Sequence, residues 1–146
     1  MVTTALSSEF ISSSEDETKE FARNLAISLG PNSIIALLGD LGSGKTTFTK
    51  GLTEKLQIEN SDVVTSPTFT YLNIYEAPIP IYHFDLYRIE TADAFLAMGF
   101  EEYFYNKGIC LIEWADPILT ILPKGTILIR ISHIDENQRK ITINTL

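Results

Sequence analysis

The hydrophobic and polar positions along the chain alternate between strand spacing and helix spacing. Residues 33–38 form an apolar run between Pro31-Asn32 and a glycine-rich segment, which is typical of a strand buried on both faces of a parallel sheet. Upstream, apolar residues recur at helical spacing up to Leu29, behind the capping-box pattern of residues 14–17 and before the helix-stopping Gly30-Pro31. The first part of the chain therefore predicts a strand at residues 1–11, a helix ending near residue 29 and a strand at residues 33–38.

The rest of the chain continues the same alternation. Pro78 and Pro80 mark the bend between two segments rich in aromatic and β-branched residues, which predicts an antiparallel pair, and Gly99 ends a short helical segment. The expected elements are helices at residues 45–56 and 90–98 and strands at residues 68–75, 79–86, 109–112, 126–131 and 139–145. The last two strands form a hairpin. The sum is a single α/β domain over residues 1–146, with a mixed parallel and antiparallel sheet flanked by helices.

Composition narrows the class of protein. The 146 residues carry 11 basic and 19 acidic side chains, and the net charge of −8 argues against non-specific binding to nucleic acid or to anionic membranes. Neither a membrane-spanning apolar run nor a signal peptide is visible, so we expect a cytoplasmic protein. Cys110 lies in an apolar run and is expected to be a buried thiol without a disulfide partner, while His83 and His133 are too few for a structural zinc site.

The segment after the strand at residues 33–38 fits the pattern G-x-x-x-x-G-K-[ST] without a mismatch. Glycines let successive amides point at phosphate oxygens, Lys45 reaches the β- and γ-phosphates, and the Thr46 hydroxyl suits Mg²⁺. A helix terminus contributes only about 0.3–1 kcal/mol, whereas micromolar binding needs about 8 kcal/mol, so the loop amides, Lys45 and Mg²⁺ must act together. The predicted nucleotide-binding residues are Gly39, Asp40, Leu41, Gly42, Ser43, Gly44, Lys45, Thr46 and Thr47.

Two carboxylates are candidates to complete this site, since such enzymes place an acid at the end of a neighbouring strand. Glu113 follows the apolar run at residues 109–112 in a Walker-B-like position, and Asp85 ends the strand that also carries His83 on the same face. Thr46, Glu113 and Asp85 are therefore the predicted metal ligands. Each acid could instead cap a turn or pair with Arg88. In the same way His83 either orients a neighbour or is a satisfied strand histidine.

A switch-like loop is predicted at Thr65, Ser66, Pro67 and Thr68, after the helix that begins in the glycine-rich segment. Many nucleotide hydrolases sense the γ-phosphate with a loop at this place in the chain. The alternative is a Ser-Pro turn that simply enters the next strand. Trp114, directly after Glu113, is likewise either packed near the site or part of the core.

Four segments in this order resemble the bacterial TsaE family. They are residues 39–48 (GDLGSGKTTF), 66–70 (SPTFT), 83–88 (HFDLYR) and 108–114 (GICLIEW). The resemblance implies a P-loop NTPase-like fold and a Mg²⁺-dependent ATPase that acts with the TsaD and TsaB proteins. That complex attaches a threonylcarbamoyl group to the adenosine next to the anticodon of tRNAs that read ANN codons. Contact with tRNA is expected only through the complex, and no contact with DNA or membrane is expected.

The resemblance also implies roles for single residues. Lys45, Asp85, Glu113 and Trp114 would form the catalytic group, with Ser14 and Arg139 as candidates for contacts to the base. The chain departs from the family pattern at two places. The family often has a proline after its Glu-Trp pair, where this chain has Ala115-Asp116, and it often has an alanine where this chain has Ser43. Neither change removes a reacting group.

The sequence also allows other functional hypotheses. A small-molecule kinase would need a lid that carries arginines, and Arg88, Arg130 and Arg139 are scattered along the chain. An assembly module would bind the nucleotide without needing to hydrolyse it. A Ras-type GTPase is disfavoured because the chain has no Asn-Lys-x-Asp motif.

Overall fold

The computed structural model describes residues 7–40, 42–56, 67 and 70–146. Its strands form one sheet in the order β1-β7-β6-β2-β5-β4-β3. The elements in chain order, with η for a 3₁₀-helix, are β1 (Ser7–Ser12), α1 (Glu15–Ala26), β2 (Ile34–Leu38), α2 (Lys45–Lys55), β3 (Leu72–Tyr75), β4 (Ile81–Asp85), α3 (Ala92–Ala97), η2 (Phe100–Tyr105), β5 (Ile109–Glu113), η3 (Asp116–Ile121), β6 (Ile127–His133) and β7 (Arg139–Thr145).

The sheet is mixed, as the sequence predicts. Strands β6, β2, β5 and β4 are parallel to one another, while β1 and β7 on one side and β3 on the other add antiparallel pairs. Every residue of β2, β4 and β5 is buried, which explains the unbroken apolar runs of β2 and of residues 109–112 in β5. Because parallel strands end at the same edge of a sheet, the segments that follow β2, β4 and β5 meet there.

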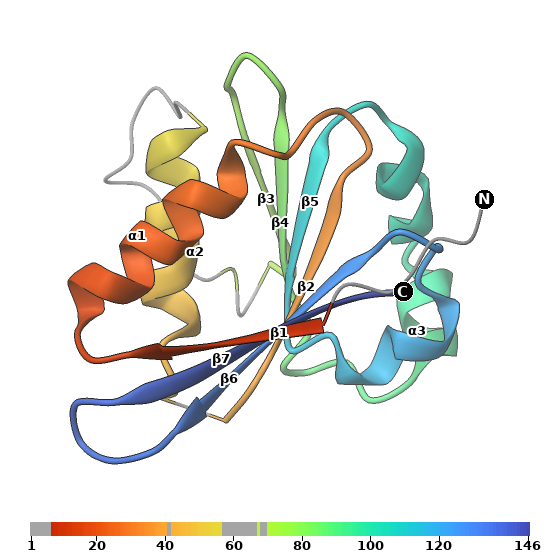
Figure 1. Cartoon of the computed structure of the whole chain (residues 1–146). Coiled ribbons are helices and arrows are strands. Elements are labelled where there is room, and N and C mark those ends of the chain that lie inside the picture. The colour runs from red at the N-terminus through yellow and green to blue at the C-terminus, as the bar shows by residue number, and fades with distance from the viewer. Residues whose placement is uncertain (1–6, 41, 57–66, 68–69) are drawn as a thin grey trace.

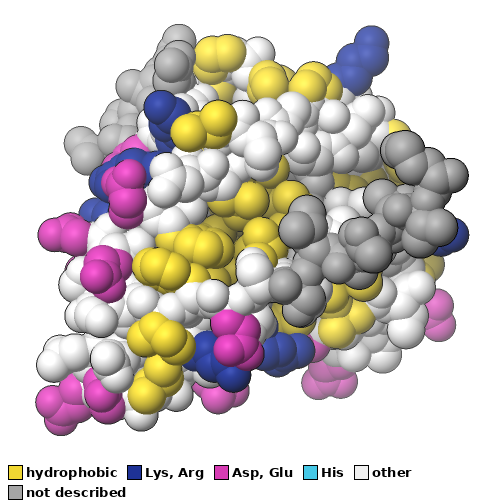
Figure 2. All heavy atoms as spheres, viewed as in Figure 1, with side chains coloured by type: hydrophobic (Ala, Val, Ile, Leu, Met, Phe, Trp, Pro, Cys, Tyr) yellow, Lys and Arg dark blue, Asp and Glu magenta, His cyan; other side chains and the backbone are white. Residues whose placement is uncertain are grey.

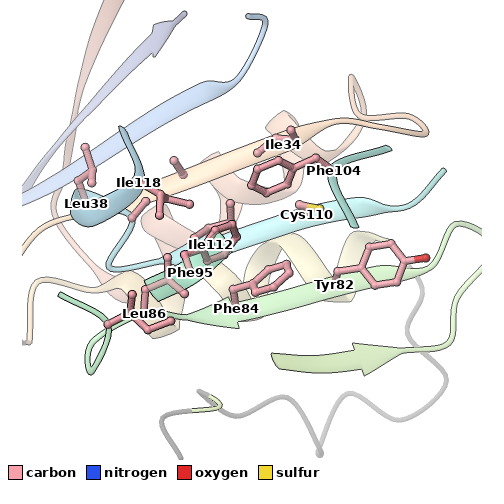
Figure 3. Close-up of a cluster of buried hydrophobic side chains, with 13 residues drawn as sticks. Ile34, Leu38, Tyr82, Phe84, Leu86, Phe95, Phe104, Cys110, Ile112 and Ile118 are labelled. Atoms are coloured by element: carbon pink, nitrogen blue, oxygen red, sulfur yellow. The ribbon is translucent and has the colours of Figure 1, made fainter. Parts of the chain in front are cut away.

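Helices cover both faces of the sheet. The long helices α1 and α2 lie on one side and α3 on the other (Figure 1). Under α1 and α2 lies an apolar cluster that includes Ala22, Phe48 and Leu52. On the opposite face Phe84 and Ile112 pack with residues of α3, η2 and η3 (Figure 3). The two cores hold the central strands in place from both sides, and so fix the edge where their carboxyl ends meet.

Several boundaries differ from the prediction. Helix α1 ends at Ala26, because the amides of Ser28 and Leu29 bond three residues back in tight turns instead of continuing the helix. Helix α3 begins only at Ala92, since the Thr91 hydroxyl accepts a hydrogen bond from the Ala94 amide and caps it. Strand β5 extends one residue further than expected and includes Glu113. The 3₁₀-helices η2 and η3 were not predicted.

The burial of Cys110 agrees with its apolar neighbours in the sequence. Cys110 is fully buried in β5, its thiol lies 3.3 Å from the Tyr103 carbonyl oxygen, and burial raises its pKa to about 12. Acidic side chains gather on the side of the molecule where α1 lies (Figure 2). Among the described residues, no helix has the length and apolar character needed to cross a membrane.

Candidate functional site

The loop between β2 and α2 requires glycine at more than one position. Gly39 has a φ of +142°, and a Cβ there would lie 2.3 Å from the Ile131 carbonyl oxygen and 2.9 Å from Ser43 Oγ. Gly42 and Gly44 also have positive φ values, of +73° and +112°. Side chains other than hydrogen are strained in this region, so the sequence Gly-x-x-Gly-x-Gly is needed for the loop to turn this tightly. Leu41 lies outside the described residues.

Helix α2 opens at this loop without a side-chain cap. Gly44 is its N-cap residue and has no side chain that could accept from the first amides of the helix. Lys45 and Thr46 form the first turn, and no acidic residue stands there to neutralise the positive end of the helix dipole. The start of α2 is therefore an electropositive terminus built from backbone amides and one lysine, a form suited to an anion.

The Lys45 ammonium is held against the loop itself. Its Nζ donates hydrogen bonds to the carbonyl oxygens of Gly39 and of Asp40, the second at 2.8 Å, and lies 3.9 Å from the centre of the Trp114 ring. Burial lowers the pKa of Lys45, and the charge of Glu113 is the largest of the nearby negative charges that oppose this shift. The side chain is thus largely removed from water and placed at the mouth of the loop.

Two carboxylates face this lysine from neighbouring strands. Asp85 and Glu113 are register partners at the carboxyl ends of β4 and β5, and both are buried. Asp85 accepts a hydrogen bond of 2.9 Å from the Tyr87 amide, which fixes the turn after β4. Glu113 Oε2 lies 2.7 Å from His83 Nε2. Because β4 runs in regular register from Ile81 to Asp85, His83 and Asp85 lie on one face of the sheet, which confirms the sequence prediction.

Trp114 adopts a backbone conformation that is unusual for a bulky residue. Its φ is +57°, in the left-handed region, and its ring lies 4.9 Å from that of Tyr87. Such strain persists only where the surrounding structure imposes it, and it concentrates at functional sites. The turn after Glu113 therefore brings the indole back over Lys45, so that Trp114 lies at the site and not in the middle of the core.

A cleft of about 900 Å³ brings these groups together. Predicted residues that line it are Gly42, Gly44, Lys45, Thr46, Thr47, Asp85, Glu113, Trp114, Ser14 and Arg139. Arg139 also ties the β6–β7 hairpin to the loop, because its Nε donates to the Ser43 carbonyl oxygen at 3.1 Å. Gly39 and Asp40 line a neighbouring cavity of about 330 Å³ with Arg130. The Ser43 side chain points inward and is fully buried.

Some predictions are not tested by the structure, and some neighbours of the site were missed. Of the switch-like segment only Pro67 is described, where its carbonyl oxygen accepts from the Tyr71 amide at 2.8 Å. Thr65, Ser66 and Thr68 lie outside the described residues. Tyr75 and Tyr87 were not singled out from the sequence. Tyr75 is placed by the pairing of β3 with β4, and Tyr87 by the turn after β4. In the sequence, only the motif at residues 83–88 could have pointed to Tyr87.

Comparison with known proteins gives the family. The family profile described as "Threonylcarbamoyl adenosine biosynthesis protein TsaE" matches residues 12–141. The chain belongs to the TsaE family. The tRNA threonylcarbamoyladenosine biosynthesis protein TsaE of Bacillus subtilis is 42% identical over 132 residues, which cover 90% of this chain and 81% of that protein. TsaE of Treponema pallidum is 35% identical over 133 residues, 91% of this chain and 97% of that protein.

A solved structure of a relative has the same fold. The crystal structure of Bacillus subtilis YdiB matches with a TM-score of 0.78 and 34% sequence identity, over 99% of this chain and 88% of that one. The family profile and the TsaE relatives confirm the resemblance of the sequence to the TsaE family. The mixed sheet flanked by helices is a fold that this chain shares with YdiB.

Proposed function

We propose that this TsaE-family chain is the Mg²⁺-dependent ATPase that supports threonylcarbamoylation of the adenosine next to the anticodon of tRNAs that read ANN codons. It would act in the cytoplasm with TsaD and TsaB, which perform the transfer itself. The observation that carries the proposal is the cleft, in which an uncapped helix start, Lys45 and two carboxylates converge. The same loop supports a P-loop NTPase-like interpretation of the fold.

The residues present fit a nucleotide phosphate and a magnesium ion. Gly39 leaves no room for a Cβ, which supports the tight glycine-rich loop form whose amides can cradle phosphate oxygens. The Thr46 hydroxyl and the carboxylates of Asp85 and Glu113 line the same cleft, and these hard oxygen donors are the ligands that Mg²⁺ prefers. Magnesium, when bound with the nucleotide, neutralises charge on the phosphate oxygens.

Each residue then has a task that its surroundings allow. Lys45 exchanges its hydrogen bonds to the Gly39 and Asp40 carbonyls for bonds to phosphate oxygens, which are charged and therefore stronger acceptors. Glu113 assists at the metal or orients the attacking water, held in place by its own hydrogen bond to the protein. Trp114 covers Lys45 and excludes water from it. Ser14 and Arg139 also line the cleft and remain candidates for contacts to the base.

The net charge of −8 supports a role that depends on partners for RNA contact. The cleft supplies positive potential locally, at Lys45, Arg139 and the start of α2. We therefore expect the isolated chain to bind tRNA weakly at physiological salt and the complex to bind it well. Tight tRNA binding by the isolated chain, measured by filter retention or fluorescence anisotropy, would overturn this part of the proposal.

The test is ATP turnover by the isolated chain and by its mixture with TsaB and TsaD, with free phosphate as the measured product. Lys45→Ala should abolish turnover, whereas Lys50→Ala, an exposed lysine of the same helix, should leave it unchanged. Normal turnover by the Lys45 variant would refute the mechanism. A phosphorylated small molecule in place of free phosphate would point to a kinase, and full tRNA modification by a variant that binds ATP without hydrolysing it would point to an assembly module.

A further inference from the structure

A buried line of polar side chains runs from the edge of the sheet to the cleft. The Tyr75 hydroxyl, from β3, lies 3.0 Å from His83 Nδ1 on β4, and His83 Nε2 lies 2.7 Å from Glu113 Oε2 on β5. The exposed fractions of the three residues are 6%, 1% and 3%. Three strands thus each contribute one side chain to a single chain of hydrogen bonds that ends at a residue of the cleft.

The direction of these hydrogen bonds follows from the chemistry of the groups. A carboxylate oxygen accepts, so His83 Nε2 donates to Glu113. In the tautomer with its proton on Nε2, the imidazole carries a lone pair on Nδ1, which accepts from the Tyr75 hydroxyl. The Asn73 side-chain amide donates to the Tyr75 oxygen at 3.5 Å, so the hydroxyl proton of Tyr75 is not used in that bond. A Tyr75 hydroxyl that donates to Nδ1 therefore favours the tautomer of His83 that donates to Glu113.

Burying these polar side chains costs folding free energy that apolar side chains at the same positions would not cost. Register pairs His83 with Leu111, in the middle of strands whose other residues are mostly apolar and entirely buried. Buried polar groups cost free energy that only good hydrogen bonds offset, and packed apolar residues of similar volume are often at least as stabilising. The line instead holds one oxygen of Glu113 at a set position, beside Lys45 and opposite Asp85.

We propose that His83, with its tautomer set by Tyr75, is a positioning residue that fixes the orientation of the Glu113 carboxylate in the cleft. The inference rests on the proposed function, because it assigns His83 and Tyr75 to the reaction that Glu113 serves. Partners that orient the side chains of a metal site change affinity or activity by about 10- to 100-fold when they are removed. His83→Ala should therefore lower kcat by about that factor, and Tyr75→Phe, which removes only the distal hydroxyl, by about 3- to 10-fold.

The experiment compares four variants in the complex with TsaB and TsaD. Tyr75→Phe and His83→Ala break the line at its two links. His83→Gln restores a donor that reaches toward Glu113, and should recover most of the activity that His83→Ala loses. The matched control is Tyr82→Phe, a buried tyrosine of β4 on the opposite face, whose hydroxyl bonds the Asn106 carbonyl oxygen at 3.2 Å away from the cleft. For Tyr75→Phe and His83→Ala we expect a lower kcat, and for Tyr75→Phe a KM for ATP within about twofold of wild type.

A second readout does not depend on turnover. The affinity for ADP is measured by calorimetry with and without MgCl₂. The ratio of the dissociation constant without MgCl₂ to that with MgCl₂ reports how well the cleft holds the metal. His83→Ala should shrink this ratio by at least about fivefold while the metal-free affinity stays within about twofold of wild type. A loss of packing would instead weaken both affinities together, and the melting temperature of each variant shows that it is folded.

The outcomes separate the two proposals. Lower kcat in Tyr75→Phe and His83→Ala, recovery in His83→Gln and wild-type behaviour in Tyr82→Phe support the positioning role. If wild type binds and hydrolyses ATP but Tyr75→Phe is indistinguishable from Tyr82→Phe, or if the KM rises while kcat is unchanged, the positioning role is wrong and the proposed function stands. A wild-type chain that neither binds nor hydrolyses ATP in the complex overturns the proposed function and this inference with it.

Discussion

Replacing Gly51 by alanine sets a local preference against a packing constraint. In an isolated helix alanine is favoured over glycine by about 1 kcal/mol, so sequence considerations alone predict that Gly51→Ala stabilises α2. In the structure, a Cβ at this position would lie 2.6 Å from the carbonyl oxygen and 2.7 Å from the Cα of Lys19, in helix α1. These are backbone atoms, so no side-chain rotation relieves the clash, and the two helices must move apart.

Overpacking costs typically about 1–3 kcal/mol, and two backbone contacts under 3 Å place this site in the upper part of that range, above the gain in helix propensity. We therefore expect Gly51→Ala to lower the free energy of unfolding by about 1–2 kcal/mol. In a domain of this size that corresponds to a fall in Tm of roughly 2–8 °C. The assay is thermal unfolding followed by circular dichroism, confirmed by urea unfolding at 25 °C.

The control is Gly30→Ala, where a Cβ would meet nothing within 4 Å and the backbone needs no positive φ. Its Tm should stay within about 2 °C of wild type, because surface substitutions without a special constraint have small effects. A Gly51→Ala variant as stable as wild type, or more stable, would refute the close packing of α1 against the helix that carries Lys45.

Three further predictions concern single residues. Gly39→Ala should weaken ADP binding at least tenfold by calorimetry, since its Cβ would meet the Ile131 carbonyl oxygen at 2.3 Å; retained affinity would contradict the loop geometry. Ser14→Ala should lower the free energy of unfolding by about 1 kcal/mol in urea, because the hydroxyl caps the Glu17 amide at 3.1 Å, and an unchanged midpoint would show that the cap is not needed. Cys110, whose pKa burial raises to about 12, should resist dithionitrobenzoate at pH 8 until the protein is unfolded, whereas rapid labelling of the native protein would place the thiol at the surface.

Much of the fold could be predicted because its signals are local. The apolar run that becomes β2, the Ser14 cap of α1 and the hairpin of β6 and β7 each depend on residues close together in the sequence. The 3₁₀-helices η2 and η3 could not be predicted in this way. Their six-residue aromatic and apolar stretches are too short for a period to decide, and they are fixed by packing onto the face of the sheet that carries Phe84 and Ile112.

The residues of the candidate site could likewise be predicted only where a local sequence pattern marks them. Lys45 and Thr46 follow from a contiguous motif, and Glu113 and Asp85 from the apolar strands that precede them. The contact of His83 with Glu113 spans 30 positions and exists only because β4 and β5 are neighbours. Arg139, 96 positions from Ser43, reaches the loop through the pairing of β7 with β6 and of β6 with β2. Such contacts require the strand order, which no local pattern encodes.

The most direct test of a nucleotide site in this cleft is calorimetric titration of ADP with MgCl₂ into wild type, Lys45→Ala and Lys50→Ala. Lys45 is the cation at the mouth of the loop, and loss of its charge-assisted hydrogen bonds to phosphate should cost at least about tenfold in affinity. We predict micromolar binding by wild type and by Lys50→Ala, and binding at least tenfold weaker by Lys45→Ala. Equal affinity in all three, or no binding by wild type, would contradict the account.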